Sequence, residues 1–142
     1  MAGIPRVVID TNVLVAASRS RLGTSFQLIS RVGKGRFDIS LSVPLVLEYE
    51  EALLRHLGET RLTGGDVEDV LDYFCSVGHL QEIFYLWRPF LPDPKDDLVL
   101  EVAIAGNCEA IITFNRKDFH GAARFGIKVL EPAKFLKNIG VL

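Results

Sequence analysis

Cysteines and long apolar runs are both scarce in this sequence. Cys75 and Cys108 are the only two cysteines among 142 residues, and no CxxC pair occurs. Neither a disulfide framework nor a zinc knuckle is therefore expected, and both thiols should be reduced. A membrane-spanning helix would need a run of about 18 apolar residues, which is missing. Asp10 also interrupts the N-terminal apolar stretch that a signal peptide would need, so we expect a cytoplasmic protein.

Acidic residues are missing from residues 11–37, a stretch that holds Arg19, Arg21, Arg31, Lys34 and Arg36. Most of the 18 acidic residues lie instead between residues 48 and 101. A net charge of −2 argues against a general nucleic-acid-coating protein. The separation of charge would let a polyanion bind the basic stretch while carboxylates elsewhere hold metal. Solvated arginines on a helix surface would give the same pattern, so charge alone does not decide.

The length and the hydrophobic content of 49% are those of one compact domain, spanning residues 1–142. Apolar, β-branched runs predict strands at residues 6–9, 37–41, 80–86, 110–114 and 127–130. Helical periodicity and capping residues predict helices after residue 10 and at residues 24–33, 43–57, 66–77, 94–105 and 132–138. This alternation predicts an α/β domain with a mostly parallel central sheet and helices on both faces.

Polar residues follow two of the predicted strands. They are Asp10, Thr11 and Asn12 after the first strand, and Thr113, Asn115 and Asp118 after the fourth. Ligands of open parallel sheets bind beyond the carboxyl ends of the strands, so these side chains are the first candidates for a site. The predicted helix that begins near Asp96 and Asp97 could bring a third acidic segment to the same edge.

The candidate ligands are all oxygens, which indicates a hard cation, Mg²⁺ or Mn²⁺, rather than zinc. Such ions serve phosphate chemistry, because they neutralise charge on the phosphate and activate water. Clustered carboxylates repel one another unless a cation is present. A single aspartate can equally be a helix cap or turn residue, and for Asp93 we favour the cap.

Three blocks of this sequence resemble those of the PIN domain family. They are VVIDTNVLV near the N-terminus, SVPLVLEYEEALLR about 40 residues later, and DPKDDLVLEVAIAGNCEAIITFNRKDF near residue 100. They are most similar to the small bacterial and archaeal PIN proteins described as toxins of toxin–antitoxin pairs, the VapC-like proteins. The resemblance implies a metal-dependent endoribonuclease that cleaves single-stranded RNA, with a parallel sheet and a carboxylate pocket.

The resemblance implies a role for each matching residue. Asp10 matches the first aspartate of the family, and Thr11 and Asn12 match small polar residues that orient it. Glu48 matches the glutamate of the long helix. Helical periodicity alone does not select Glu48, since Glu50 lies nearer the stripe of Val46, Leu53 and Leu57.

The third acid falls in the doublet Asp96-Asp97, and its exact position stays open. Counting back from the strand exit favours Asp97, whereas the DPxD pattern favours Asp96. We take Asp10, Glu48 and Asp97 as catalytic, with Asp96 and Asp118 as further metal ligands.

At the fourth acidic position this sequence has Asn115, which predicts one firmly bound ion. Thr113 matches a small hydroxyl that lines the pocket of relatives. Arg19, Arg21, Arg116 and Lys117 are our candidates for RNA binding.

Partners follow from the resemblance, which implies a homodimer and a small antitoxin protein. Two other enzyme or signalling classes fit less well. A haloacid-dehalogenase-type phosphatase needs an acid where Asn12 stands, and a receiver domain needs an acidic pair before Asp10. The stronger alternative is a PIN-fold module that binds RNA or protein without cutting, which Asn115 favours and Asp10 and Glu48 oppose.

Overall fold

The computed structural model describes residues 3–83 and 90–142, and these form a parallel sheet in the order β3-β2-β1-β4-β5. The strands are β1 (Arg6–Ile9), β2 (Asp38–Leu41), β3 (His79–Leu80), β4 (Ala110–Ile112) and β5 (Lys128–Leu130). The central strand β1 lies between β2 and β4, and Val7 pairs with both Ile39 and Ala110. The predicted α/β architecture with a parallel sheet is confirmed.

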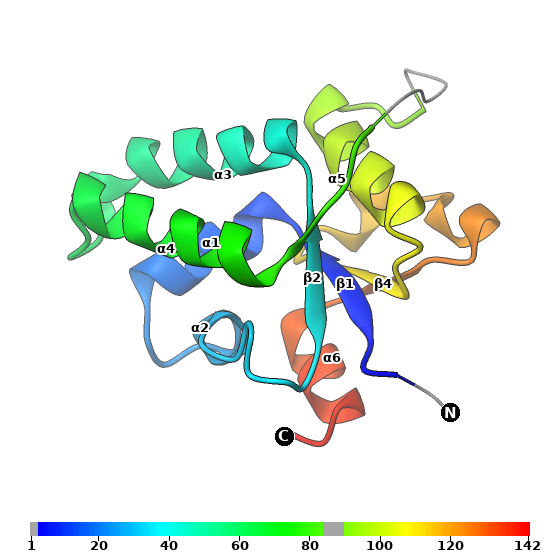
Figure 1. Cartoon of the computed structure of the whole chain (residues 1–142), viewed down its shortest axis with the longest axis horizontal. Coiled ribbons are helices and arrows are strands. Elements are labelled where there is room, and N and C mark those ends of the chain that lie inside the picture. The colour runs from blue at the N-terminus through cyan, green and yellow to red at the C-terminus, as the bar shows by residue number, and fades with distance from the viewer. Residues whose placement is uncertain (1–2, 84–89) are drawn as a thin grey trace.

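Helices cover both faces of this sheet. They are α1 (Thr11–Arg19), α2 (Thr24–Ile29), α3 (Val43–Arg55), α4 (Gly64–Val77), α5 (Pro94–Ala105) and α6 (Pro132–Asn138). Figure 1 shows α1, α3 and α4 to one side of the strands, whereas α5 lies to the other side and packs on β1, β2 and β4. The chain adds strands outward from β1 to β3, then returns through α5 to β4 on the opposite side of β1. The switch in direction therefore lies between β1 and β4, where ligands bind in such sheets.

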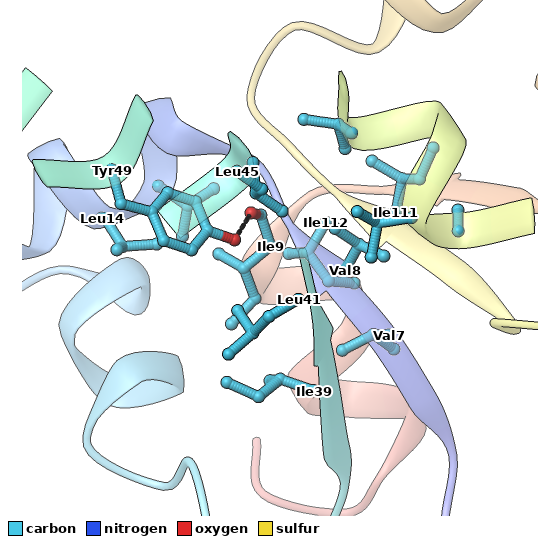
Figure 2. Close-up of a cluster of buried hydrophobic side chains, with 14 of the residues drawn as sticks. Val7, Val8, Ile9, Leu14, Ile39, Leu41, Leu45, Tyr49, Ile111 and Ile112 are labelled. Atoms are coloured by element: carbon cyan, nitrogen blue, oxygen red, sulfur yellow. Dashed lines mark hydrogen bonds between the residues drawn. The ribbon is translucent and has the colours of Figure 1, made fainter. Parts of the chain in front are cut away.

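The core consists of apolar side chains from the central strands and from the helices that cover them. Val7, Val8 and Ile9 of β1 are at most 1% exposed, which explains the unbroken apolar run of a strand buried on both faces. Figure 2 shows Tyr49 of α3 reaching into this cluster, where its hydroxyl donates to the carbonyl oxygen of Ile9. The last residue of β1 is thereby tied to α3.

Capping residues set the starts of the helices near the sheet edge. Ser42 caps α3, because its hydroxyl oxygen accepts the amide proton of Leu45 at 3.2 Å. Asp93 caps α5 through the amide of Lys95 at 2.9 Å, which confirms the cap role favoured for it. Within the described ranges, no helix combines the length and apolar character that crossing a membrane requires.

Several predicted boundaries need correction. The strand predicted over residues 80–86 is wrong over 81–83, because β3 is confined to His79–Leu80, and residues 84–86 lie outside the described part. The helix predicted over 24–33 ends at Ile29, since turns follow and Gly33 adopts a φ of 78°. The strands predicted at 37–41, 110–114 and 127–130 are each one or two residues shorter.

Candidate active site

Asp10 occupies the carboxyl end of the central strand β1 and caps α1. Only 7% of the residue is exposed, and both carboxylate oxygens accept hydrogen bonds. Oδ1 accepts the amide proton of Thr11 at 2.8 Å, and Oδ2 accepts the hydroxyl proton of Thr113 at 2.7 Å. Burial raises the pKa of Asp10, the bonds from Thr113 and Thr11 lower it, and the charges of Asp118 and Glu48 raise it. A buried carboxylate with two acidic neighbours is therefore fixed at the topological switch point.

The exit of β4 is joined to the exit of β1 by side chains. Besides its bond to Asp10, the hydroxyl oxygen of Thr113 accepts the amide proton of Asn115 at 3.0 Å. Asn12 spans the two segments, because its Nδ2 donates to Thr113 Oγ1 at 3.4 Å and its Oδ1 accepts from the amide of Phe114 at 3.4 Å. The polar residues predicted at the two strand exits are thus brought together in one network.

Glu48 lies in the first half of α3, and only 12% of its side chain is exposed. The buried stripe of α3 comprises Leu45, Tyr49, Ala52 and Leu53. This stripe passes beside Glu48 and leaves Glu50 exposed. The expectation that Glu50 lies nearer the stripe is wrong, because Leu45 rather than the half-buried Val46 sets the helix phase.

A lysine lies next to Glu48. The Nζ atom of Lys95, in the first turn of α5, stands 3.6 Å from Oε1 of Glu48. About half of the lysine side chain is exposed, so the ammonium group remains hydrated and contributes little to stability. Sequence reasoning did not select Lys95, because only the packing of α5 against α3 brings it to Glu48.

Asp96 and Asp97 are adjacent in the first turn of α5, but their surroundings differ. Asp96 is half-buried, and burial, followed by the charges of Asp10, Asp93 and Asp118, raises its pKa to about 7. Since charge–charge effects fall with distance, this dependence places Asp96 in the electrostatic reach of Asp10.

Asp97 is 3% exposed and faces the chain that precedes α5. Its Oδ1 accepts the amide proton of Leu91 at 3.0 Å. Its Oδ2 is buried with no hydrogen-bond partner in the described part of the chain. One oxygen of Asp97 therefore holds the segment at Leu91, and the other is an unsatisfied acceptor.

The carboxylate oxygens of the candidate residues are ligands that suit a divalent cation. Asp10, Glu48, Asp96 and Asp118 offer only oxygen ligands. Burial first, and then the charges of neighbouring acids, raise the pKa of Asp10 and of Asp96. In the arrangement of residues 3–83 and 90–142, however, no three acidic, histidine or cysteine side chains are grouped so that they could hold an ion. Glu48 faces the Lys95 ammonium group instead. Ligation would require these side chains to converge, with Glu48 released from Lys95.

The four basic residues proposed to bind RNA fall into two places. Arg116 and Lys117 line a hollow of about 730 Å³. Asp118 also lines it, so the hollow adjoins the acidic cluster, by which we mean Asp10, Glu48, Asp96 and Asp118. Arg19 and Arg21 line a different hollow of about 690 Å³ at the C-terminal end of α1. At a rise of 1.5 Å per residue, that end of the helix lies about 13 Å from Asp10. Arg19 is also paired with Glu59 at 3.2 Å.

Comparison with known proteins identifies the family of this chain. The family profile described as PIN domain matches residues 6–117, which include both strand exits and the start of α5. The chain belongs to the PIN domain family. PIN domains are generally nucleases, which supports a hydrolase.

A solved structure has the same fold. The crystal structure of VapBC2 from Rickettsia felis, bound to a DNA fragment from their promoter, includes a chain that superimposes on this PIN domain with a TM-score of 0.56. The two are 16% identical, and the match covers 89% of this chain and 99% of the other. A search of curated protein sequences finds no match.

Sequence reasoning missed the positioning role of Tyr49 in this PIN domain. Tyr49 lies on the apolar stripe of α3, and its ring is fully buried. Its hydroxyl, however, bonds to the residue that precedes Asp10. A tyrosine on a core stripe was a usable signal, because a buried hydroxyl needs a partner.

Proposed function

We propose that this PIN domain is a Mg²⁺- or Mn²⁺-dependent endoribonuclease that hydrolyses single-stranded RNA. The observation that carries the proposal is the buried carboxylate of Asp10, held between β1 and β4 by Thr113 and within electrostatic reach of Asp96 and Asp118. A set of acidic groups at this position has little structural use, since each lowers the stability of the others' charged forms. A phosphodiester substrate brings further negative charge, so cleavage here requires a cation.

Asp10, Glu48 and Asp96 would hold the ion, and Asp118 would complete the acidic set. When bound, the ion supplies positive charge for the phosphate and acidifies water, as expected of Mg²⁺ or Mn²⁺ in phosphodiester hydrolysis. Thr113 and Thr11 fix both oxygens of Asp10, so this carboxylate is oriented before substrate arrives. Asn115 supplies no negative charge at the fourth position, and we therefore expect one firmly bound ion.

The decisive experiment measures cleavage of labelled RNA in Mg²⁺ or Mn²⁺, with and without chelator. Cleavage should stop in chelator and in Asp10→Asn, whereas Asp72→Asn, at an exposed position on α4, should cleave like the wild type. Cleavage that persists in chelator or in Asp10→Asn would overturn the mechanism. Binding of RNA without cleavage in any metal would favour the alternative, a PIN-fold binding module, which Asn115 and the ungrouped carboxylates support.

We further propose a small antitoxin as a partner in the cytoplasm, consistent with the VapBC2 complex that shares the fold. The hollow at the C-terminal end of α1 offers a seat, because apolar residues line it and Arg21 and Arg61 stand among them. Leu22, which is 93% exposed, lies in its lining. An apolar helix with acidic flanks fits this chemistry. Co-purification of a neighbouring gene's product should be lost in Leu22→Asp, and retention would count against this seat.

A homodimer is a separate proposal. Val43, Leu47 and Leu54 are spaced along one face of α3 and are 58%, 58% and 43% exposed. An apolar stripe of this kind on a helix surface suits contact with a second copy of the chain.

A further inference from the structure

The hollow beside the acidic cluster combines an aromatic side chain with charges of both signs. It measures about 730 Å³ and is lined by Phe114, Asn115, Arg116, Lys117, Asp118 and Glu131. A volume of this order suits a ligand of nucleotide size. Asp118 belongs to this lining and also raises the pKa of Asp10 and of Asp96, so the hollow adjoins the acidic cluster.

Phe114 is placed for contact with a ligand rather than for packing in the core. It follows β4 directly, and 39% of it is exposed, although Thr113 immediately before it is fully buried. Its amide donates to Oδ1 of Asn12, and the amide of Asn115 donates to Thr113. The backbone that carries the ring is therefore fixed to the same network that holds Asp10.

The charges around the ring favour a base over a bare phosphate backbone. Arg116 and Lys117 are balanced by Asp118 and Glu131, so the lining offers no net positive charge to a polyanion. The ring supplies a stacking surface. The carboxylate of Glu131 and the side-chain amide of Asn115 can form hydrogen bonds with the edge of a base. The two basic side chains can meet the phosphate of the same nucleotide.

We propose that this hollow holds one unpaired nucleotide of the RNA, with its base stacked on Phe114, next to the bond that is cut. The inference rests on the proposed nuclease function and deepens it, because it names the residue that selects single strands. A paired base inside a helix has both faces covered, whereas an unpaired base can stack on an aromatic side chain.

Binding without cleavage tests the inference separately from the nuclease. A hexanucleotide RNA that carries one 2-aminopurine is titrated with the protein in chelator, and the fluorescence of the base reports stacking. Phe114→Leu should bind roughly 5- to 140-fold more weakly than wild type, the range of a single base–aromatic stack. Phe114→Trp should retain binding. Phe125→Leu is the matched control, since Phe125 is 40% exposed and lies outside the hollow, and it should bind like wild type.

Two results would overturn the inference: wild type that binds no hexanucleotide, or Phe114→Leu that binds within twofold of wild type. Failure of the nuclease proposal looks different. If wild type binds through Phe114 but cuts no RNA in Mg²⁺ or Mn²⁺, the proposed subsite is supported and the nuclease proposal is wrong. If wild type cuts RNA and Phe114→Leu leaves both binding and KM unchanged, the nuclease stands and the subsite falls.

Discussion

Among single residues, the two neighbouring aspartates of α5 differ most in what surrounds them. Asp96 has its pKa raised to about 7 by burial and by other acids of the cluster, whereas Asp97 bonds to the amide of Leu91. The sequence favoured Asp97 as the ligand, and the surroundings now lead us to propose Asp96.

We predict that Asp96→Asn lowers Mn²⁺ affinity at least tenfold, because it removes a ligand charge from the cluster. Asp97→Ala should instead lower the free energy of unfolding by about 1–3 kcal/mol, since it leaves the Leu91 amide without its acceptor. Calorimetric titration with Mn²⁺ and chemical unfolding separate the two effects. If Asp97→Asn loses more Mn²⁺ affinity than Asp96→Asn, the ligand is Asp97, by way of its unsatisfied Oδ2.

The raised pKa of Asp96 also predicts how stability changes with pH in the absence of metal. Between the ordinary aspartate pKa of 3.8 and about 7, folded Asp96 holds a proton that the unfolded chain has released. The stability from this group is fully present below pH 3.8 and is lost as pH rises through about 7. In chelator, the melting temperature should therefore fall between about pH 5 and pH 7 and level off at higher pH, and the fall should be smaller in Asp96→Asn. An equal fall in both proteins would refute this assignment.

Among the elements, α3 determines how the site is assembled. It starts at Val43, directly after its cap residue Ser42 and the end of β2, and it contacts both α1 and α5. Within one turn it carries Glu48 to the acidic cluster and Tyr49 to the end of β1. Because adjacent residues of a helix point about 100° apart, one helix can place a buried anchor and a proposed ligand side by side.

Removal of the anchor should loosen the site. Tyr49→Phe keeps the buried ring but loses the hydrogen bond to the carbonyl of Ile9, at a cost of about 1 kcal/mol in the free energy of unfolding. Because Ile9 precedes Asp10, Mn²⁺ affinity should also fall. Tyr73→Phe is the matched control, since its hydroxyl bonds to the carbonyl of Val32 at 2.8 Å, away from the site. If both variants bind Mn²⁺ equally well, Tyr49 serves stability alone.

The contact between α3 and α5 leads to a prediction of the opposite sign. Lys95→Gln removes the ammonium group that stands 3.6 Å from Glu48, so Glu48 becomes free to bind a cation. Mn²⁺ affinity should rise severalfold, with the melting temperature little changed, because exposed ion pairs contribute about 0–1 kcal/mol. Lys34→Gln, at an exposed position after α2, is the control. Weaker Mn²⁺ binding in Lys95→Gln would show that the lysine supports the site instead.

At the scale of the whole molecule, the basic stretch seen in the sequence does not lie at the acidic cluster. The acid-free segment begins beside Asp10, but its Arg19 and Arg21 line another hollow. The basic residues next to the acidic cluster are Lys95, Arg116 and Lys117, in segments that the overall charge pattern did not single out.

The exposed stripe of α3 predicts the oligomeric state. Leu54→Glu should convert a dimer to a monomer, because a charge in an apolar contact must be desolvated without a partner. Leu22→Glu is the control, since Leu22 is exposed but lies outside the stripe. Sedimentation velocity measures both. A wild type that stays monomeric at tens of micromolar, or a Leu54→Glu variant that stays dimeric, would refute the stripe as an interface.

The sequence by itself determined the type and order of nearly all elements. Apolar β-branched runs such as that of β1, and caps such as Ser42 and Asp93, act within a few residues, so their effect can be inferred locally. Strand exits also marked Asp10 and Thr113, because strands buried in a parallel sheet are mostly apolar and polar residues gather where they end. The boundaries were less certain, as the short β3 shows, because backbone pairing with β2 limits it.

Only the tertiary structure decided which of two similar acidic residues, close together in the sequence, lies at the candidate site. Asp96 and Asp97 have almost the same local sequence, yet the packing of α5 leaves Asp96 within electrostatic reach of Asp10 and Asp97 hydrogen-bonded to Leu91. Glu48 and Glu50 are separated in the same way by the helix phase, which Leu45 and Tyr49 set when they enter the core. The contact of Lys95 with Glu48, and the hollow beside Phe114, also join segments distant in sequence. Such contacts depend on how whole elements pack, and no local pattern encodes them.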